Sequence, residues 1–171
     1  MLQFFPTSEF PLMVRDGGRR RYRPATGEQI LAAARQVIDQ KMQRGTSLES
    51  PANVREYLRT KLAGYDYEVF SLLTLDNRHR LIEYIELFRG TIDGASVHPR
   101  EVVRETLRVN AAAVIFAHNH PGMDPSPGSD DIHVTRELVK AGKLLEIDVH
   151  DHLVISGGRF TSMRERGLGF D

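Results

Sequence analysis

The sequence predicts an α/β fold in which helices flank a mixed β-sheet. Segments with the composition of strands alternate along the chain with segments of helical periodicity, an order typical of layered α/β proteins. The run from Ala111 to Ala117 is apolar throughout, which indicates a strand buried on both faces. Polar residues follow this run at once, beginning with His118. We therefore expect a central strand whose C-terminal end carries the functional site.

The composition limits the class of protein before any motif is considered. A chain of 171 residues with 40% hydrophobic and 27% charged residues has the make-up of about one globular domain. The 23 basic and 23 acidic residues cancel, so attraction to nucleic acid or anionic lipid would require a local patch. The absence of cysteine excludes a disulfide framework and a cysteine nucleophile. No long apolar run occurs, and Pro6 and Pro11 interrupt the N-terminal segment, so we expect a soluble cytoplasmic protein.

The first 47 residues are predicted to be an N-terminal extension, distinct from a domain over residues 48–171. Prolines and glycines punctuate residues 1–25, where Phe10 to Val14 has the composition of a short strand that turns at Asp16-Gly17. The same stretch contains a basic cluster, made of Arg15, Arg19, Arg20, Arg21 and Arg23. Such a tract is most often a solvated arm, and contact with DNA phosphates is the alternative interpretation.

Two helices are predicted next. Thr26 has the side chain of a helix cap, and Gly45 ends the apolar pattern that follows it at helical spacing, Ile30, Ala34, Val37, Ile38 and Met42. Ser50-Pro51 is the start signal of a second helix, which closes at Gly64 and has the apolar stripe Val54, Tyr57, Leu58 and Leu62.

The middle of the chain contains two predicted antiparallel strands and a helix. The strands are VFSLLTL, directly after Glu68, and LIEYIELF, and the polar residues 76–80 join them. After a connector at residues 90–96, Pro99 fits the first position of a helix whose inward residues would be Val102, Val103 and Leu107. This helix leads into the central strand.

The C-terminal part is predicted to return to the sheet. Apolar residues between Ile147 and Ile155 indicate a strand, Gly157-Gly158 a tight turn, and residues 159–161 the returning strand. Ser162 fits the cap of a final short helix.

The chemistry is concentrated just after the central strand. Side chains alternate in extended backbone, so His118 and His120 point to one side and Asn119 is turned away. A loop rich in proline and glycine leads to the helix-start signal Ser129-Asp130-Asp131, followed by the stripe Val134, Leu138, Ala141 and Leu145. A carboxylate in that first helical turn can fold back over the histidines, and composition alone does not choose between the two aspartates. Two histidines and one carboxylate suit zinc, with the fourth position left for water.

These residues resemble a known family. His118, His120 and Asp131 stand at the spacing of the JAMM metalloprotease motif, and the sequences HNHP and DPSP are similar to those of the RadC family. The resemblance covers roughly residues 48 to 168, through the segments 68–70, 87–93, 97–102, 110–113, 151–152 and 162–167. It implies a JAB/MPN core with the cytidine-deaminase-like fold, and it selects Asp131 over Asp130 as the third zinc ligand.

The resemblance also implies an activity. A zinc-dependent metallopeptidase or isopeptidase would act on a peptide or isopeptide substrate, with Glu68 as the general base, while the pair Asp151-His152 would support the site. The motif has a serine where this chain has Gly128, so Ser129, one place later, is the candidate donor to the oxyanion. The alternative is a metal-binding protein with weak or no catalysis that takes part in DNA repair or mobile-element DNA transactions through the basic cluster. A metal-dependent nuclease or deaminase is weaker. The residues of the HNH nuclease motif are dispersed along a ββα finger, and the chain lacks the His-x-Glu and Pro-Cys-x-x-Cys motifs of deaminases.

Overall fold

The predicted α/β fold is confirmed by the computed structural model, which describes residues 12–15, 18, 21–48, 50–90 and 97–171. Its main sheet has the strand order β4-β3-β5-β6-β7. The strands are β3 (Val69–Leu75), β4 (Leu81–Arg89), β5 (Ala113–Asn119), β6 (Asp148–Ser156) and β7 (Arg159–Ser162). Only β5 and β6 are parallel, and the other neighbours are antiparallel. The sheet is therefore mixed, and the predicted antiparallel pair β3–β4 is confirmed.

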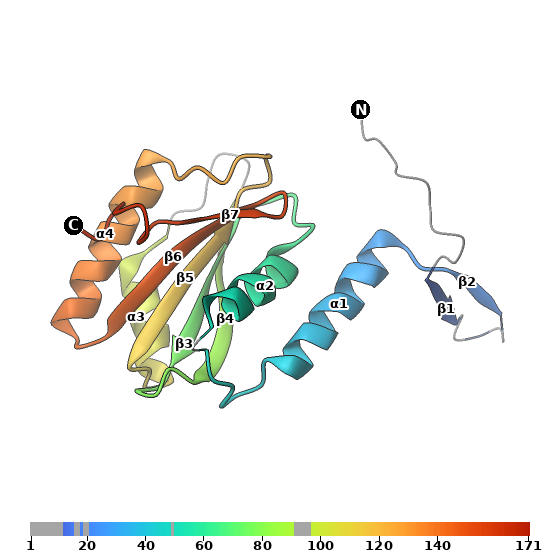
Figure 1. Ribbon diagram of the computed structural model, residues 1–171, viewed down its shortest axis with the longest axis horizontal. Coiled ribbons are helices and arrows are strands. Elements are labelled where there is room, and N and C mark those ends of the chain that lie inside the picture. The colour runs from blue at the N-terminus through green and yellow to red at the C-terminus, as the bar shows by residue number, and fades with distance from the viewer. Residues whose placement is uncertain (1–11, 16–17, 19–20, 49, 91–96) are drawn as a thin grey trace.

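Helices cover both faces of this sheet (Figure 1). Helix α2 (Pro51–Leu62) packs on one face, while α3 (Pro99–Arg108) and α4 (Ser129–Leu144) pack on the other. Alternate residues of β5 belong to the two cores, with Ile115 on the α2 side and Phe116 on the α4 side. All seven residues of β5 are buried, as its apolar sequence predicted. Burying an Ile or Phe side chain completely stabilises the fold by roughly 1.5–3 kcal/mol. Because its side chains enter both cores, β5 is the strand that the two helical layers share.

The predicted N-terminal helix is α1 (Gly27–Lys41), and its cap is confirmed. The Thr26 hydroxyl accepts from the Gln29 N–H at 3.3 Å, and the Thr26 N–H donates to the Gln29 side chain at 3.1 Å. Asp39 ties the helix to α2 through Tyr57, at 3.0 Å, and Lys61, at 3.0 Å. Gly45, with φ 90°, lies in the turn after the helix rather than at its end.

A small hairpin lies on the far side of α1 from the main sheet (Figure 1). It consists of β1 (Met13–Arg15) and β2 (Tyr22–Pro24), which are antiparallel. The predicted strand from Phe10 to Val14 overlaps β1, but its first residues and the turn at Asp16-Gly17 lie outside the described residues, as does most of the connector 90–96. None of the described helices has both the length and the apolar composition needed to span a membrane.

Some predicted helix details are wrong. Leu107 and Leu145 are exposed, whereas Thr106, Thr135 and Gly142 are buried. On α3 the buried face runs from Val102 to Thr106, one turn later, and Leu107 lies about 100° further around the helix. Ser162 makes the predicted cap contact, because its hydroxyl accepts from the Glu165 N–H at 3.0 Å, but turns follow it instead of a helix, and Gly167 and Gly169 in this segment adopt positive φ of 67° and 77°.

The hairpin β6–β7 closes with the predicted two-residue turn. Gly157 and Gly158 have φ of 54° and 81°, the left-handed conformation that a tight hairpin turn requires and that glycine adopts without strain. A Cβ atom at Gly157 would come within 3.2 Å of the Met123 side chain. The hairpin tip therefore packs against the loop that follows the histidines.

Candidate metal centre

Three potential ligands meet at the C-terminal end of β5. His118 lies in the strand, His120 directly follows it, and Asp131 lies in the first turn of α4. The two Nε2 atoms are 3.0 Å apart, and Asp131 lies 3.3 Å from Nε2 of His118 through Oδ1 and 3.6 Å from Nε2 of His120 through Oδ2. A tetrahedral zinc ion with bonds of about 2.0–2.1 Å separates its ligand atoms by roughly 3.3 Å. The donor set and its spacing therefore fit a zinc ion, with one position left for water.

The protonation of His120 is set by a backbone group. Its Nδ1 lies 3.1 Å from the carbonyl oxygen of Asp124, which can only accept a hydrogen bond. Nδ1 must therefore carry the proton, and in the neutral ring Nε2 keeps a lone pair that points toward His118 and Asp131. This is the tautomer that a metal ligand requires.

A chain of hydrogen bonds sets the same tautomer in His118. The Thr135 hydroxyl donates to the backbone carbonyl of Asp131 at 2.6 Å, so its oxygen must accept from Nδ1 of His152, also at 2.6 Å. Neutral His152 then accepts at Nε2 from Nδ1 of His118, at 2.8 Å. Nε2 of His118 is thereby left with its lone pair toward the other two ligands.

The electrostatics of the group also favour a cation. Burial of Asp131 disfavours its ionised form, but its interactions with His118 and His120 when these rings carry a proton outweigh burial and hold the pKa of Asp131 far below its usual range. The hydrogen bond with Asp131 raises the pKa of His120. Burial lowers the pKa of His152 well below the ordinary value, and the charge of His118 adds to this effect. The group thus combines a permanent carboxylate with a deeply buried neutral histidine behind it.

Asp131, and not Asp130, faces the histidines. Asp130 is exposed and lies outside the ligand group, although it lines the adjoining cavity. The second carboxylate oxygen of Asp131 accepts from the Gly128 N–H at 2.8 Å, which fixes the side chain over the first turn of α4. Gly128 caps the helix with φ −79°, and the exposed Ser129 is its first residue.

Glu68 shares a cavity with the ligands. The cavity has a volume of about 410 Å³, and Glu68, Phe70, His118 and Asp131 are among the residues that line it. Glu68 stands directly before β3 and is half-buried. Its backbone carbonyl accepts from the Gly90 N–H at 2.7 Å, which ties the residue to the end of β4. Glu68 therefore lines the same cavity as His118 and Asp131, and its backbone is fixed at the start of β3.

Asn119 braces the backbone on both sides of Glu68. Its side chain is buried and turned away from the histidines, as predicted. The Asn119 Oδ1 atom accepts from the Val69 N–H at 2.8 Å, and its Nδ2 atom donates to the Tyr67 carbonyl at 2.8 Å. Sequence reasoning missed this role. The available signal was that a polar residue in a central strand must find partners once it is buried.

Asp151 organises the turns behind His152. It accepts from the N–H groups of His152, at 2.7 Å, and Arg164, at 3.1 Å, while the Ser162 hydroxyl donates to it at 2.7 Å. Burial raises the pKa of Asp151, which these hydrogen bonds oppose. The turn brings the Met163 sulfur to 3.6 Å from the Thr135 hydroxyl. The Asp151-His152 pair thus links the C-terminal segment to the three potential ligands.

Most of the chain matches a known protein family. Residues 48–168 match the family model of the RadC-like JAB domain. A UPF0758 protein of Marinobacter nauticus is 51% identical over 157 residues, which are 92% of this chain and 69% of that protein. A UPF0758 protein of Vibrio cholerae serotype O1 is 51% identical over 152 residues, 87% of this chain and 96% of that protein. A third, from Cellvibrio japonicus, is 53% identical over 138 residues, 81% of this chain and 62% of that protein. The resemblance to RadC-type sequences is therefore confirmed, and the chain belongs to the RadC-like JAB domain family.

Proposed function

We propose that the protein is a zinc-dependent metallopeptidase or isopeptidase. The observation that carries this proposal is the convergence of two Nε2 lone pairs and one carboxylate on a single point, with Glu68 in the same cavity. His118, His120 and Asp131 would hold the ion. A zinc ion bound there would lower the pKa of a coordinated water to about 7 and polarise the scissile carbonyl.

Glu68 would move the proton. It would take a proton from the attacking water as the oxygen bonds to the carbonyl carbon, and return that proton to the leaving nitrogen as the C–N bond breaks. Asn119 would keep Glu68 in position through Tyr67 and Val69. Such proton transfer contributes typically 10²–10⁴-fold in rate.

Stabilisation of the oxyanion is the weak point of this site. The Gly128 N–H already donates to Asp131, so it is not free to donate to a substrate oxygen. Ser129 lies at the exposed start of α4 and does not line the cavity that holds Glu68. Loss of one oxyanion donor costs about 10²–10³-fold in turnover, so we expect a slow enzyme.

A paired experiment tests the proposal. Wild-type protein and Glu68→Gln would be loaded with zinc, checked for one ion per chain, and screened against peptides and isopeptide-linked conjugates. We expect equal zinc content, with cleavage by the wild type only. Zinc-loaded wild type that cleaves nothing in the screen, or equal cleavage by Glu68→Gln, would contradict the proposal.

A second candidate function is contact with DNA through the N-terminal hairpin. Arg15, Arg21 and Arg23 are exposed on or beside β1 and β2, and within the described part of the chain they form no ion pair. Guanidinium groups free of partners can contact phosphates, and such binding weakens steeply with salt. The test compares the affinity of the full chain for duplex DNA with that of a variant carrying Arg15→Ala, Arg21→Ala and Arg23→Ala, at several salt concentrations. Equal affinity of the two proteins would exclude this role for the hairpin.

A further inference from the structure

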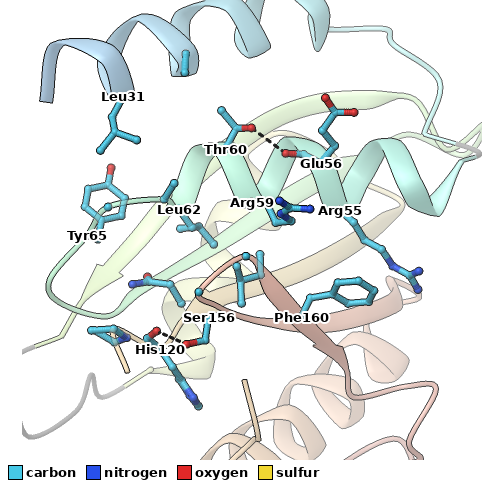
Figure 2. Close-up of a pocket in the computed structure, with 18 of the residues that line it drawn as sticks. Leu31, Arg55, Glu56, Arg59, Thr60, Leu62, Tyr65, His120, Ser156 and Phe160 are labelled. Atoms are coloured by element: carbon cyan, nitrogen blue, oxygen red, sulfur yellow. Dashed lines mark hydrogen bonds between the residues drawn. The ribbon is translucent and has the colours of Figure 1, made fainter. Parts of the chain in front are cut away.

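A groove adjoins the metal centre on the α2 side of the sheet. It has a volume of about 1030 Å³ and lies between α2 and the hairpin β6–β7, as Figure 2 shows. His120 lines this groove, whereas His118 and Asp131 line the cavity that contains Glu68. The groove therefore reaches one residue of the ligand group, and a chain lying in it would pass beside the candidate metal centre.

The lining of the groove suits an extended peptide. Apolar side chains contribute much of it, among them Leu62, Met123, Ile155 and Phe160, and the Ser156 hydroxyl points to its floor, where it donates to the His120 carbonyl at 2.9 Å. Ligand sites in proteins commonly combine an apolar surface with a few polar groups that set orientation. The volume lies at the upper end of the range for small-ligand pockets, which leaves room for several residues of a peptide.

Arg59 is a basic side chain of this groove without a partner among the residues that the structure describes. Its neighbour Arg55 is bound to Glu165 at 2.6 Å and stacks on the ring of Phe160 at 4.3 Å. The side chain of Arg59, in contrast, has no hydrogen bond or ion pair with any residue that the structure describes, and it is exposed. It reaches from α2 toward the hairpin, where a Cβ atom at Gly158 would lie 3.8 Å from its Nη2 (Figure 2).

The surroundings of Arg59 carry further positive charge. A second hollow of about 560 Å³, which Arg59 also lines, contains Arg159 and Arg166. Its one acidic residue, Asp124, accepts from both the N–H and the hydroxyl of Ser126, at 3.0 and 2.7 Å. In the groove itself Glu56 is the one acidic lining residue, and its side chain makes no ion pair with Arg59 or with any other residue that the structure describes. The guanidinium of Arg59 is thus open to a carboxylate from outside the chain.

We propose that this groove binds an extended substrate peptide and that Arg59 pairs with a carboxylate of that peptide. As a statement about substrates, the inference rests on the proposed peptidase function. A guanidinium presents a planar fork of donors that fits a carboxylate at two points. Nucleic acid is a poorer fit, because its binding depends on several phosphate contacts, and the groove offers one free guanidinium among apolar side chains.

Binding of defined peptides tests the inference apart from cleavage. The protein would be the full-length Glu68→Gln variant loaded with zinc, and the probes short acetylated and amidated peptides of fixed length in an alanine–leucine background. One position at a time would be Glu, Gln or Lys, and a parallel set would have a free C-terminal carboxylate. We expect Glu peptides to bind about tenfold tighter than Gln peptides at the matching position. A preference seen only in the parallel set would assign the carboxylate to the C-terminus of the peptide.

Variants of Arg59 make the result specific. Arg59→Ala should abolish the preference and Arg59→Glu should turn it toward Lys peptides, while Arg78→Ala, an exposed arginine in the loop before β4, should leave it unchanged. Equal binding of Glu, Gln and Lys peptides, or a preference that survives in Arg59→Ala, would overturn the inference. Binding of a single-stranded oligonucleotide that depends on Arg59, without any preference among peptides, would also overturn it. If the protein prefers Glu peptides but cleaves nothing, the role of the groove is supported and the proposed peptidase function is contradicted. If it cleaves a substrate but shows no preference for Glu peptides, the peptidase function is supported and the role of the groove is contradicted.

Discussion

The candidate metal centre has a strand half and a loop half, and the two are held in different ways. His118 belongs to β5, is buried, and donates a hydrogen bond from Nδ1 to the fully buried His152. His120 belongs to the loop, and its partner is the backbone carbonyl of Asp124, an exposed residue. The loop is also held by the buried hydroxyl of Ser156, which donates to the His120 carbonyl, and by the exposed Arg159, which donates to the Met123 carbonyl. The strand half is therefore fixed by side chains of the protein interior, whereas the loop half is fixed mainly through backbone carbonyls.

The largest effect is expected from removing the strand ligand. His118→Ala should abolish stoichiometric zinc binding at neutral pH, because only two protein ligands would remain where a catalytic zinc site needs three. Zinc content after dialysis measures the effect. Full zinc retention by the double variant His118→Ala, His120→Ala would show that the ion is held elsewhere.

Substitution of the partners of the two histidines compares the halves directly. His152→Phe keeps an aromatic ring but removes the acceptor of the His118 Nδ1–H, and we expect a 10–100-fold loss of zinc affinity. Asp124→Ala leaves the backbone carbonyl that His120 uses and removes only the contacts to Ser126, so a loss of a few-fold is expected. Chelator competition measures both affinities. A larger loss in Asp124→Ala than in His152→Phe would contradict the division into halves.

The pH dependence of zinc binding reports on the loop half. Zinc and protons compete for His120, whose pKa is raised above 6.5 by its hydrogen bond with Asp131, while Asp131 stays ionised. Affinity should therefore be highest above that raised pKa and fall about tenfold per pH unit below it, already at pH values where an ordinary histidine is neutral. Calorimetry in buffers of different ionisation enthalpy would count the released proton. A fall in affinity that begins only below pH 6.5 would show that the hydrogen bond with Asp131 has no effect.

The part of this site that follows from sequence is the part made by neighbours along the chain. The period of a strand places His118 and His120 together and turns Asn119 away, and the motif spacing selects Asp131. The bracing contacts depend on tertiary structure, because Asn119 meets Val69 across 50 residues and His118 meets His152 across 34. Thr135 was not predicted as a link, since its role arises only when α4 packs against β6. Leu107 failed as a core residue for a related reason: the packing of α3, rather than apolarity alone, decides which of its residues are buried.

The smallest change, one hydroxyl in the loop half, is the most informative about catalysis. Gly128 has φ −79°, a conformation open to any residue, and an added Cβ would meet only Asp131 Oδ2, at an ordinary 3.5 Å. Gly128→Ser is therefore expected to fold normally and even to improve the helix cap. The N–H of residue 128 would still hold Asp131, so zinc affinity should change little, while the new hydroxyl supplies the oxyanion donor that the motif has at this position.

Turnover should rise by about tenfold or more with the zinc affinity unchanged, since the hydroxyl acts on the transition state. Steady-state kinetics with any substrate found for the wild type, alongside Gly128→Ala as the control that adds a Cβ without a hydroxyl, measures this gain. Equal turnover of the serine and alanine variants would show that the loop half does not supply the oxyanion donor at this position.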